Sequence, residues 1–176
     1  MAPNYETQLR LLIEKFPPLP HHFVDEDGGP ESVIEAYNKG ESIPIYKGDS
    51  ENTIWGSPEA NWLLRAHHDS IHLKYGIPFT PIGEYIAAEI SSALAQHMRM
   101  EKLALALRAD IAGFSAYHAE NSVFAPQELI FFAIREIFNQ SKLNIWIGVV
   151  TTYSFWCSND LTRSIISNLD VLFASN

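Results

Sequence analysis

The sequence contains little cysteine and little positive charge, and each shortage excludes a class of protein. Cys157 is the only cysteine among 176 residues, which excludes an intrachain disulfide and a cysteine-rich zinc site and favours a reducing, cytoplasmic compartment. Twelve lysines and arginines stand against 21 aspartates and glutamates, giving a formal net charge of −9. A surface of this charge repels a phosphate backbone, so we expect no extended nucleic acid as a partner.

Long apolar runs and the common catalytic signatures are also missing. The longest apolar stretch, residues 143–157, is interrupted by polar residues and is too short to cross a bilayer, so we expect no membrane segment. The sequence has neither a glycine-rich phosphate loop nor a GxSxG elbow. With 47% hydrophobic and 19% charged residues, it has the composition of an ordinary folded domain.

Apolar residues spaced three and four apart predict a mainly α-helical protein. We expect a single, compact helical bundle over residues 1–176, whose central layer consists of helices over residues 62–74, 81–98 and 100–118. The short segments IPIY and NTIW predict a β-hairpin near residues 43–55, and the turn-rich residues 19–29 predict an irregular connection. Further helices are predicted over residues 5–16, 30–39, 126–139 and 160–173, while residues 143–157 fit a strand or a buried helix.

Three histidines and one aspartate fall within residues 67–72, in the segment RAHHDSIHL. On a helix, His68 and His72 lie four residues apart on one face, where two imidazoles can bind one metal ion. Asp69 beside them can bind metal, orient a histidine or accept a proton. The structural alternative is a partly buried polar helix whose histidines bond to backbone or carboxylate groups.

Two acidic residues fall on the apolar faces of the next two predicted helices. Glu89 and Asp110 each stand within a stripe of apolar residues of helical period. A buried carboxylate requires an ion pair, hydrogen bonds or a metal ion. A metal site shared with the histidines predicts Asp110 as a ligand and Glu89 as a further ligand or catalytic carboxylate. The ion-pair partners that the sequence offers instead are Arg65, Arg99 and Arg108.

The His-Asp doublet in WLLRAHHDSIHLKYG, together with LRADIAGFSAY, resembles the HD family of metal-dependent phosphohydrolases over about residues 57–120. The resemblance implies a helical enzyme in which His68, Asp69 and Asp110 hold a divalent ion, whether Mn, Zn, Fe, Co or Mg. Water would attack a nucleotide or other small phosphoester, which Arg65 and Lys74 would help to neutralise.

The chain departs from the HD pattern at one ligand. The family uses an earlier histidine on a preceding helix, for which this chain offers His21 and His22 in a proline-rich connection. His72, one turn after the doublet, is an alternative ligand. The arrangement of HDxxH before a helix that begins with Gly-Glu is also similar to small tailed-phage proteins, which implies the host cytoplasm without implying an activity.

Two other interpretations remain open. HDSIH is similar to the zincin HExxH, with Asp69 as the base and Glu84 or Glu89 as the third ligand, although aspartate is one methylene shorter than the zincin glutamate. The other interpretation is a non-enzymatic phage accessory, virion or host-inhibitor protein with a structural histidine and carboxylate network. It would act through a host protein or through self-association.

Overall fold

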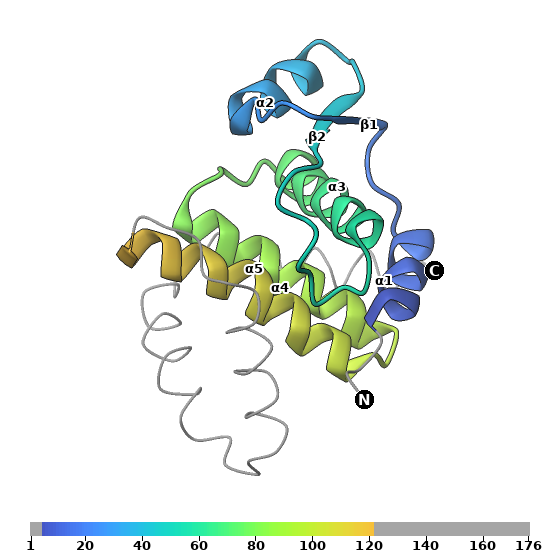
Figure 1. The fold of residues 1–176 in the computed structure, drawn as a ribbon. Coiled ribbons are helices and arrows are strands. Elements are labelled where there is room, and N and C mark those ends of the chain that lie inside the picture. Colours follow the sequence, from blue (N-terminus) through green and yellow to red (C-terminus); the bar gives the residue numbers. More distant parts are fainter. Residues whose placement is uncertain (1–4, 122–176) are drawn as a thin grey trace. The chain divides into compact units, whose positions relative to one another are not determined.

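The structure, a computed structural model, describes residues 5–121, which lie within one compact unit. These residues form five helices and a two-stranded sheet (Figure 1). The mainly helical class predicted from the sequence is confirmed. The helices predicted over residues 126–139 and 160–173, the segment 143–157 and Cys157 lie outside the described residues. A single domain over residues 1–176 stays a prediction.

The predicted helices of the described region are all present, with ends that differ by a few residues. The elements follow in the order α1 (Tyr5–Lys15), β1 (His21–Val24), α2 (Gly29–Asn38), β2 (Ile43–Tyr46), α3 (Pro58–Tyr75), α4 (Pro81–His97) and α5 (Glu101–Asn121). None of these helices has both the length and the apolar character needed to cross a membrane.

Helix α3, which carries the histidines, and helix α4, which carries Glu84 and Glu89, each begin at an N-cap residue that the sequence supplies. The Ser57 hydroxyl accepts a hydrogen bond from the Ala60 amide at 3.2 Å, and the Thr80 hydroxyl accepts one from the Gly83 amide at 3.2 Å. A proline follows each cap, where its missing amide hydrogen is not needed. Gly76 ends α3 in the left-handed region, with φ of 63°.

The predicted β-hairpin near residues 43–55 is wrong. Strand β2 forms, but its partner is β1, from the segment predicted as irregular, and the two strands run parallel with His21 opposite Ile43. Helix α2 makes the crossover that a parallel pair requires. Residues 52–55 do not continue the sheet, because fully buried Trp55 turns into the core, where its ring lies 6.0 Å from that of Tyr5.

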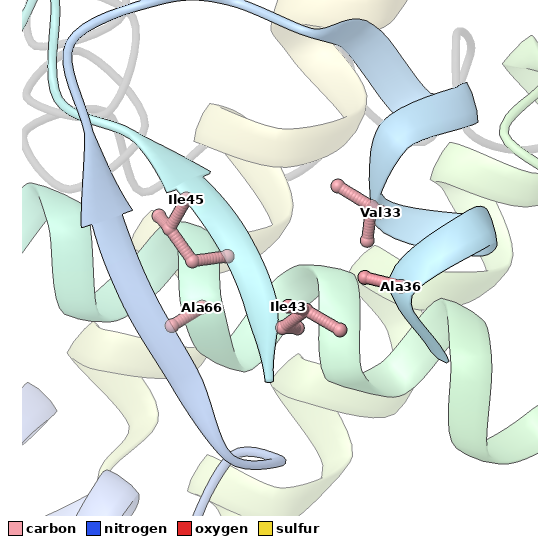
Figure 2. Close-up of a cluster of buried hydrophobic side chains, with 5 residues drawn as sticks. All are labelled: Val33, Ala36, Ile43, Ile45 and Ala66. Carbon is pink, nitrogen blue, oxygen red and sulfur yellow. The ribbon is translucent and has the colours of Figure 1, made fainter. Parts of the chain in front are cut away.

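The sheet and α2 pack on α3 through a compact apolar cluster (Figure 2). Ile43 and Ile45 alternate along β2 and are each 1% exposed, while Val33 and Ala36 come from α2. Ala66 of α3 completes the cluster. Burial of these side chains holds the β1–α2–β2 segment against the part of α3 that carries the histidines.

Gly83, in the first turn of α4, is packed so closely that no side chain fits. A Cβ atom there would overlap the carbonyl oxygen of Pro78 and lie 3.2 Å from Ile77 Cγ2. We expect Gly83→Ala to lower the free energy of unfolding by about 2–3 kcal/mol, because the turn between α3 and α4 must move. Urea denaturation measures this change.

Gly113 in α5 provides the matched control for that substitution. A Cβ atom there meets nothing within 4 Å. Gly113→Ala should therefore raise the free energy of unfolding by about 0.5–1 kcal/mol, since alanine loses less backbone entropy than glycine in a helix. Changes of the same sign in the two variants would contradict the proposed crowding at Gly83.

Candidate metal centre

Helices α3 and α4 bring two histidines and a glutamate together. The turn after Gly76 reverses the chain, and the Ile77 amide donates to the His72 carbonyl oxygen at 2.8 Å. The first turn of α4 is thereby placed beside the last turns of α3. Potential ligand atoms of His68, His72 and Glu84 all lie within 4.8 Å of one another. We define these three residues as the His-His-Glu cluster.

The cluster has the geometry that the spacing of the histidines predicts. The ring centroids of His68 and His72 are 4.5 Å apart, so the two imidazoles do share a face of α3. Glu84 Oε2 lies 2.9 Å from His68 Nε2, and Glu84 Oε1 lies 3.4 Å from His72 Nε2. The His72 side chain is fully buried, whereas the other two remain partly accessible.

The surroundings of His72 determine which tautomer its neutral imidazole adopts. Its Nδ1 lies 3.1 Å from the Ile77 carbonyl oxygen, and since a carbonyl only accepts, Nδ1 carries a proton. The Phe79 ring stacks on the imidazole with centroids 4.2 Å apart. In neutral His72 the unprotonated Nε2 therefore faces Glu84 Oε1, another acceptor. Nε2 is buried and has no hydrogen-bond partner among the described residues, so a cation at this point, either a second proton on His72 or a metal ion, would relieve the contact between the two acceptors.

The charges of the cluster also shift the pKa values of His68 and Glu84. Burial disfavours protonated His68, but the hydrogen bond to Glu84 and the nearby carboxylates outweigh burial and raise the pKa of His68. Burial would raise the pKa of Glu84, yet the interactions with His68 and His72 lower it to about 2. Glu84 is therefore ionised at neutral pH and can act as an anionic ligand, while binding of a metal would displace protons from the imidazoles.

A cavity of about 850 Å³ opens beside the cluster. His68 and Glu84 contribute to its wall together with Asp69 and Asp110, so the two predicted ligands His68 and Asp110 face a common space. Asp69 stands outside the cluster itself. Burial raises the pKa of its carboxyl group, and the charges of His68 and His72 oppose this effect only in part.

Asp110 is the most deeply placed carboxylate of the cavity wall. It is 6% exposed, and its Oδ2 accepts a hydrogen bond from Trp55 Nε1 at 3.0 Å. Its Oδ1 is buried and has no hydrogen-bond partner among residues 5–121. Burial raises the pKa of Asp110 to about 6, and the Trp55 hydrogen bond lowers it only partly. The sequence prediction that Asp110 is buried is confirmed.

Glu89 lies in an ion pair between α4 and α5. Its Oε1 lies 2.6 Å from Arg108 Nε, and its Oε2 lies 2.7 Å from Arg108 Nη2. An ion pair with Arg108 was one of the alternatives to a catalytic or metal-binding role that we considered for Glu89 from the sequence. Glu89 does not belong to the His-His-Glu cluster.

The two predicted substrate-binding cations both bind backbone carbonyl groups. Arg65 Nη1 donates to the carbonyl oxygens of Tyr46 and Gly48 at 2.9 and 2.8 Å, and so fixes the chain after β2. Lys74 Nζ donates to the Pro17 carbonyl oxygen at 2.7 Å. Of these two cations, Arg65 lines the cavity and Lys74 does not.

The remaining histidines of the N-terminal half do not join the cluster. His21 Nδ1 donates to the Leu19 carbonyl oxygen at 2.9 Å, and His22 Nδ1 hydrogen-bonds with Ser42 Oγ at 2.8 Å. Burial lowers the pKa of His67 to about 4, so this residue is a neutral part of the core. The earlier histidine of the HD pattern thus has no counterpart in the cluster.

Two residues of the site were missed or undervalued by the sequence analysis. Glu84 entered only as a third ligand of the zincin-like alternative, and Trp55 was not singled out. The signal for Glu84 was its place in the first turn of the helix that follows α3 after a short connection, which returns it to the end of α3. The sequence holds no comparable signal for the contact between Trp55 and Asp110, which are 55 residues apart.

Comparisons of the chain with protein-family models, with curated proteins and with solved structures find no match. The resemblance to HD phosphohydrolases and to tailed-phage proteins therefore stays an expectation from the sequence.

Proposed function

We propose that the protein is a metal-dependent hydrolase that binds one divalent ion between His68, His72 and Glu84. The observation that supports this most strongly is that His72 Nε2 faces Glu84 Oε1 at 3.4 Å while Nδ1 is committed to the Ile77 carbonyl. Histidines that bind metal commonly donate their other ring N–H to a backbone carbonyl in this way. Two imidazoles and one carboxylate form a known catalytic zinc set, which leaves a position open for water.

The chemistry of the site follows from its neighbours in the cavity. A divalent ion on the cluster would polarise the substrate and lower the pKa of a bound water. Asp69 follows His68 in the chain and lines the same cavity, so we assign it the role of general base that takes the proton of the attacking water. Asp110 lies outside the three-residue cluster, and we assign it the role of binding the substrate. Phosphoesters are the first substrate class to test and amides the second.

Metal uptake is the direct test of this proposal. Protein stripped by a chelator and then offered Zn²⁺, Mn²⁺, Fe²⁺, Co²⁺ or Mg²⁺ is expected to retain about one equivalent of at least one ion, as measured by elemental analysis after gel filtration. Glu84→Gln and His72→Ala should lose this ion, since each removes a ligand. Glu89→Gln is the matched control, because Glu89 pairs with Arg108 outside the cluster.

Two results would overturn the metal site. One is wild-type protein that takes up none of the five ions, and the other is full uptake by both Glu84→Gln and His72→Ala. A hydrolysis screen of the loaded protein, first with nucleotides and bis(p-nitrophenyl) phosphate and then with peptides, tests the enzymatic part. Activity should be lost in Glu84→Gln and kept in Glu89→Gln.

A non-enzymatic binding role is the second candidate, and the same cluster supports it. A second proton on His72 would also satisfy the two facing acceptors, so that Glu84 would join α3 to α4 through two imidazoles. The cluster would then be structural, and the protein would act by binding a partner such as a host protein. In that case Glu84→Gln lowers the melting temperature while the wild-type protein takes up no metal.

A further inference from the structure

The cavity beside the His-His-Glu cluster is strongly acidic. Seven carboxylate side chains line it, against one guanidinium group and the imidazole of His68. The guanidinium group, that of Arg65, already donates to the carbonyl oxygens of Tyr46 and Gly48. The cavity therefore has an excess of negative charge, which attracts cations and repels anionic groups.

One carboxylate of the cavity wall has a buried oxygen that lacks a hydrogen-bond partner among the described residues. Asp110 is 94% buried, with Oδ2 held by Trp55 and Oδ1 without a hydrogen-bond partner in the described part of the chain. A buried carboxylate oxygen without a donor destabilises the protein, because it has lost water and gained no hydrogen bond. A positively charged donor that reaches this carboxylate from the cavity would supply the missing hydrogen bond.

The rest of the wall favours an organic cation over a bare ion. Apolar side chains also line the cavity, among them Val33, Ile45, Phe79, Ile111 and Phe114. Such side chains gain free energy by covering an apolar group and offer nothing to a hydrated metal ion. The volume of about 850 Å³ also exceeds what a single ion with its water would fill.

We propose that the cavity binds a small molecule that carries an ammonium group on an apolar stem, with the ammonium group donating to the Asp110 carboxylate. The proposed function then makes the substrate a phosphoester or amide that bears this amine, with its reacting bond at the His-His-Glu cluster. That second statement rests on the proposed function. Binding of the amine does not rest on it, because Asp110 is not a member of the cluster. Among phosphoesters, nucleoside polyphosphates carry several negative charges that the carboxylates would repel, so they are disfavoured relative to singly charged phosphodiesters.

Three probes of similar shape and different charge test the proposal: benzylamine, benzyl alcohol and benzoate. Protein-observed NMR titrations at about pH 8, where the Asp110 carboxylate is ionised, give their affinities for metal-stripped protein. We expect benzylamine to bind at least about tenfold more tightly than benzyl alcohol, and benzoate to bind more weakly still. Asp110→Asn should reduce the benzylamine affinity by about tenfold or more and leave the benzyl alcohol affinity unchanged.

The controls separate this site from the metal site. Glu89→Gln, which removes a carboxylate of an ion pair between α4 and α5, should bind benzylamine as the wild type does. Equal affinities for benzylamine and benzyl alcohol, no benzylamine binding, or unchanged benzylamine affinity in Asp110→Asn would each overturn the proposal. So would a second equivalent of bound metal that Asp110→Asn removes, because Asp110 would then be a metal ligand. Amine binding by protein that takes up no metal would support the amine site and refute the metal site.

Discussion

Asp69→Asn is expected to lower kcat of the metal-loaded protein by about a hundredfold to ten-thousandfold, while the bound metal stays at the wild-type level. The reason is that asparagine keeps the size of the side chain but cannot take the proton of the attacking water. The carboxylate of Asp69 lines the cavity beside the cluster without belonging to it. Steady-state hydrolysis and elemental analysis of the same preparation measure the two quantities.

Other outcomes for Asp69→Asn would change the assignment in specific ways. Loss of the metal together with the activity would make Asp69 a ligand, which is the role that the HD resemblance implies. An unchanged kcat would remove Asp69 from the reaction. The melting temperature of the variant distinguishes either result from simple unfolding, and Glu89→Gln again serves as the control carboxylate.

Asp110→Asn is expected to stabilise the protein at about pH 8 by up to about 3 kcal/mol. Burial raises the pKa of Asp110 from its ordinary value of 3.8 to about 6. Between these two values the folded protein binds a proton that the unfolded chain lacks, so the free energy of unfolding rises as the pH falls from about 6 to about 4. Above about pH 6 the carboxyl group is ionised in the folded protein, and the free energy of unfolding is lowered by the whole of this effect. Asparagine removes the charge.

Urea denaturation of wild type and Asp110→Asn at about pH 8 and about pH 4 measures this effect. The stability advantage of the variant should be large at the higher pH and small at the lower one, where the carboxyl group is protonated. An equal difference at both pH values would show that the charge of Asp110 is not its cause. A gain in stability on removal of a cavity carboxylate is typical of a residue kept for binding or catalysis.

The sequence by itself determined the helices within residues 5–121 and the shared face of the two site histidines. Caps at Ser57 and Thr80, the stop at Gly76 and the spacing of apolar residues act within one or two turns of the chain, so they can be read without knowledge of the fold. The separation of four residues likewise places His68 beside His72 wherever the helix lies.

Only the tertiary structure decided which distant groups complete the site. Glu84 joins the histidines because a short turn folds α4 back on α3. Trp55, whose ring is buried near that of Tyr5, donates to Asp110 across 55 residues of sequence. The parallel pairing of β1 with β2 also depends on packing across α2 and α3. These contacts join residues far apart in the chain, and their free energy depends on burial and on partners that a local pattern does not specify.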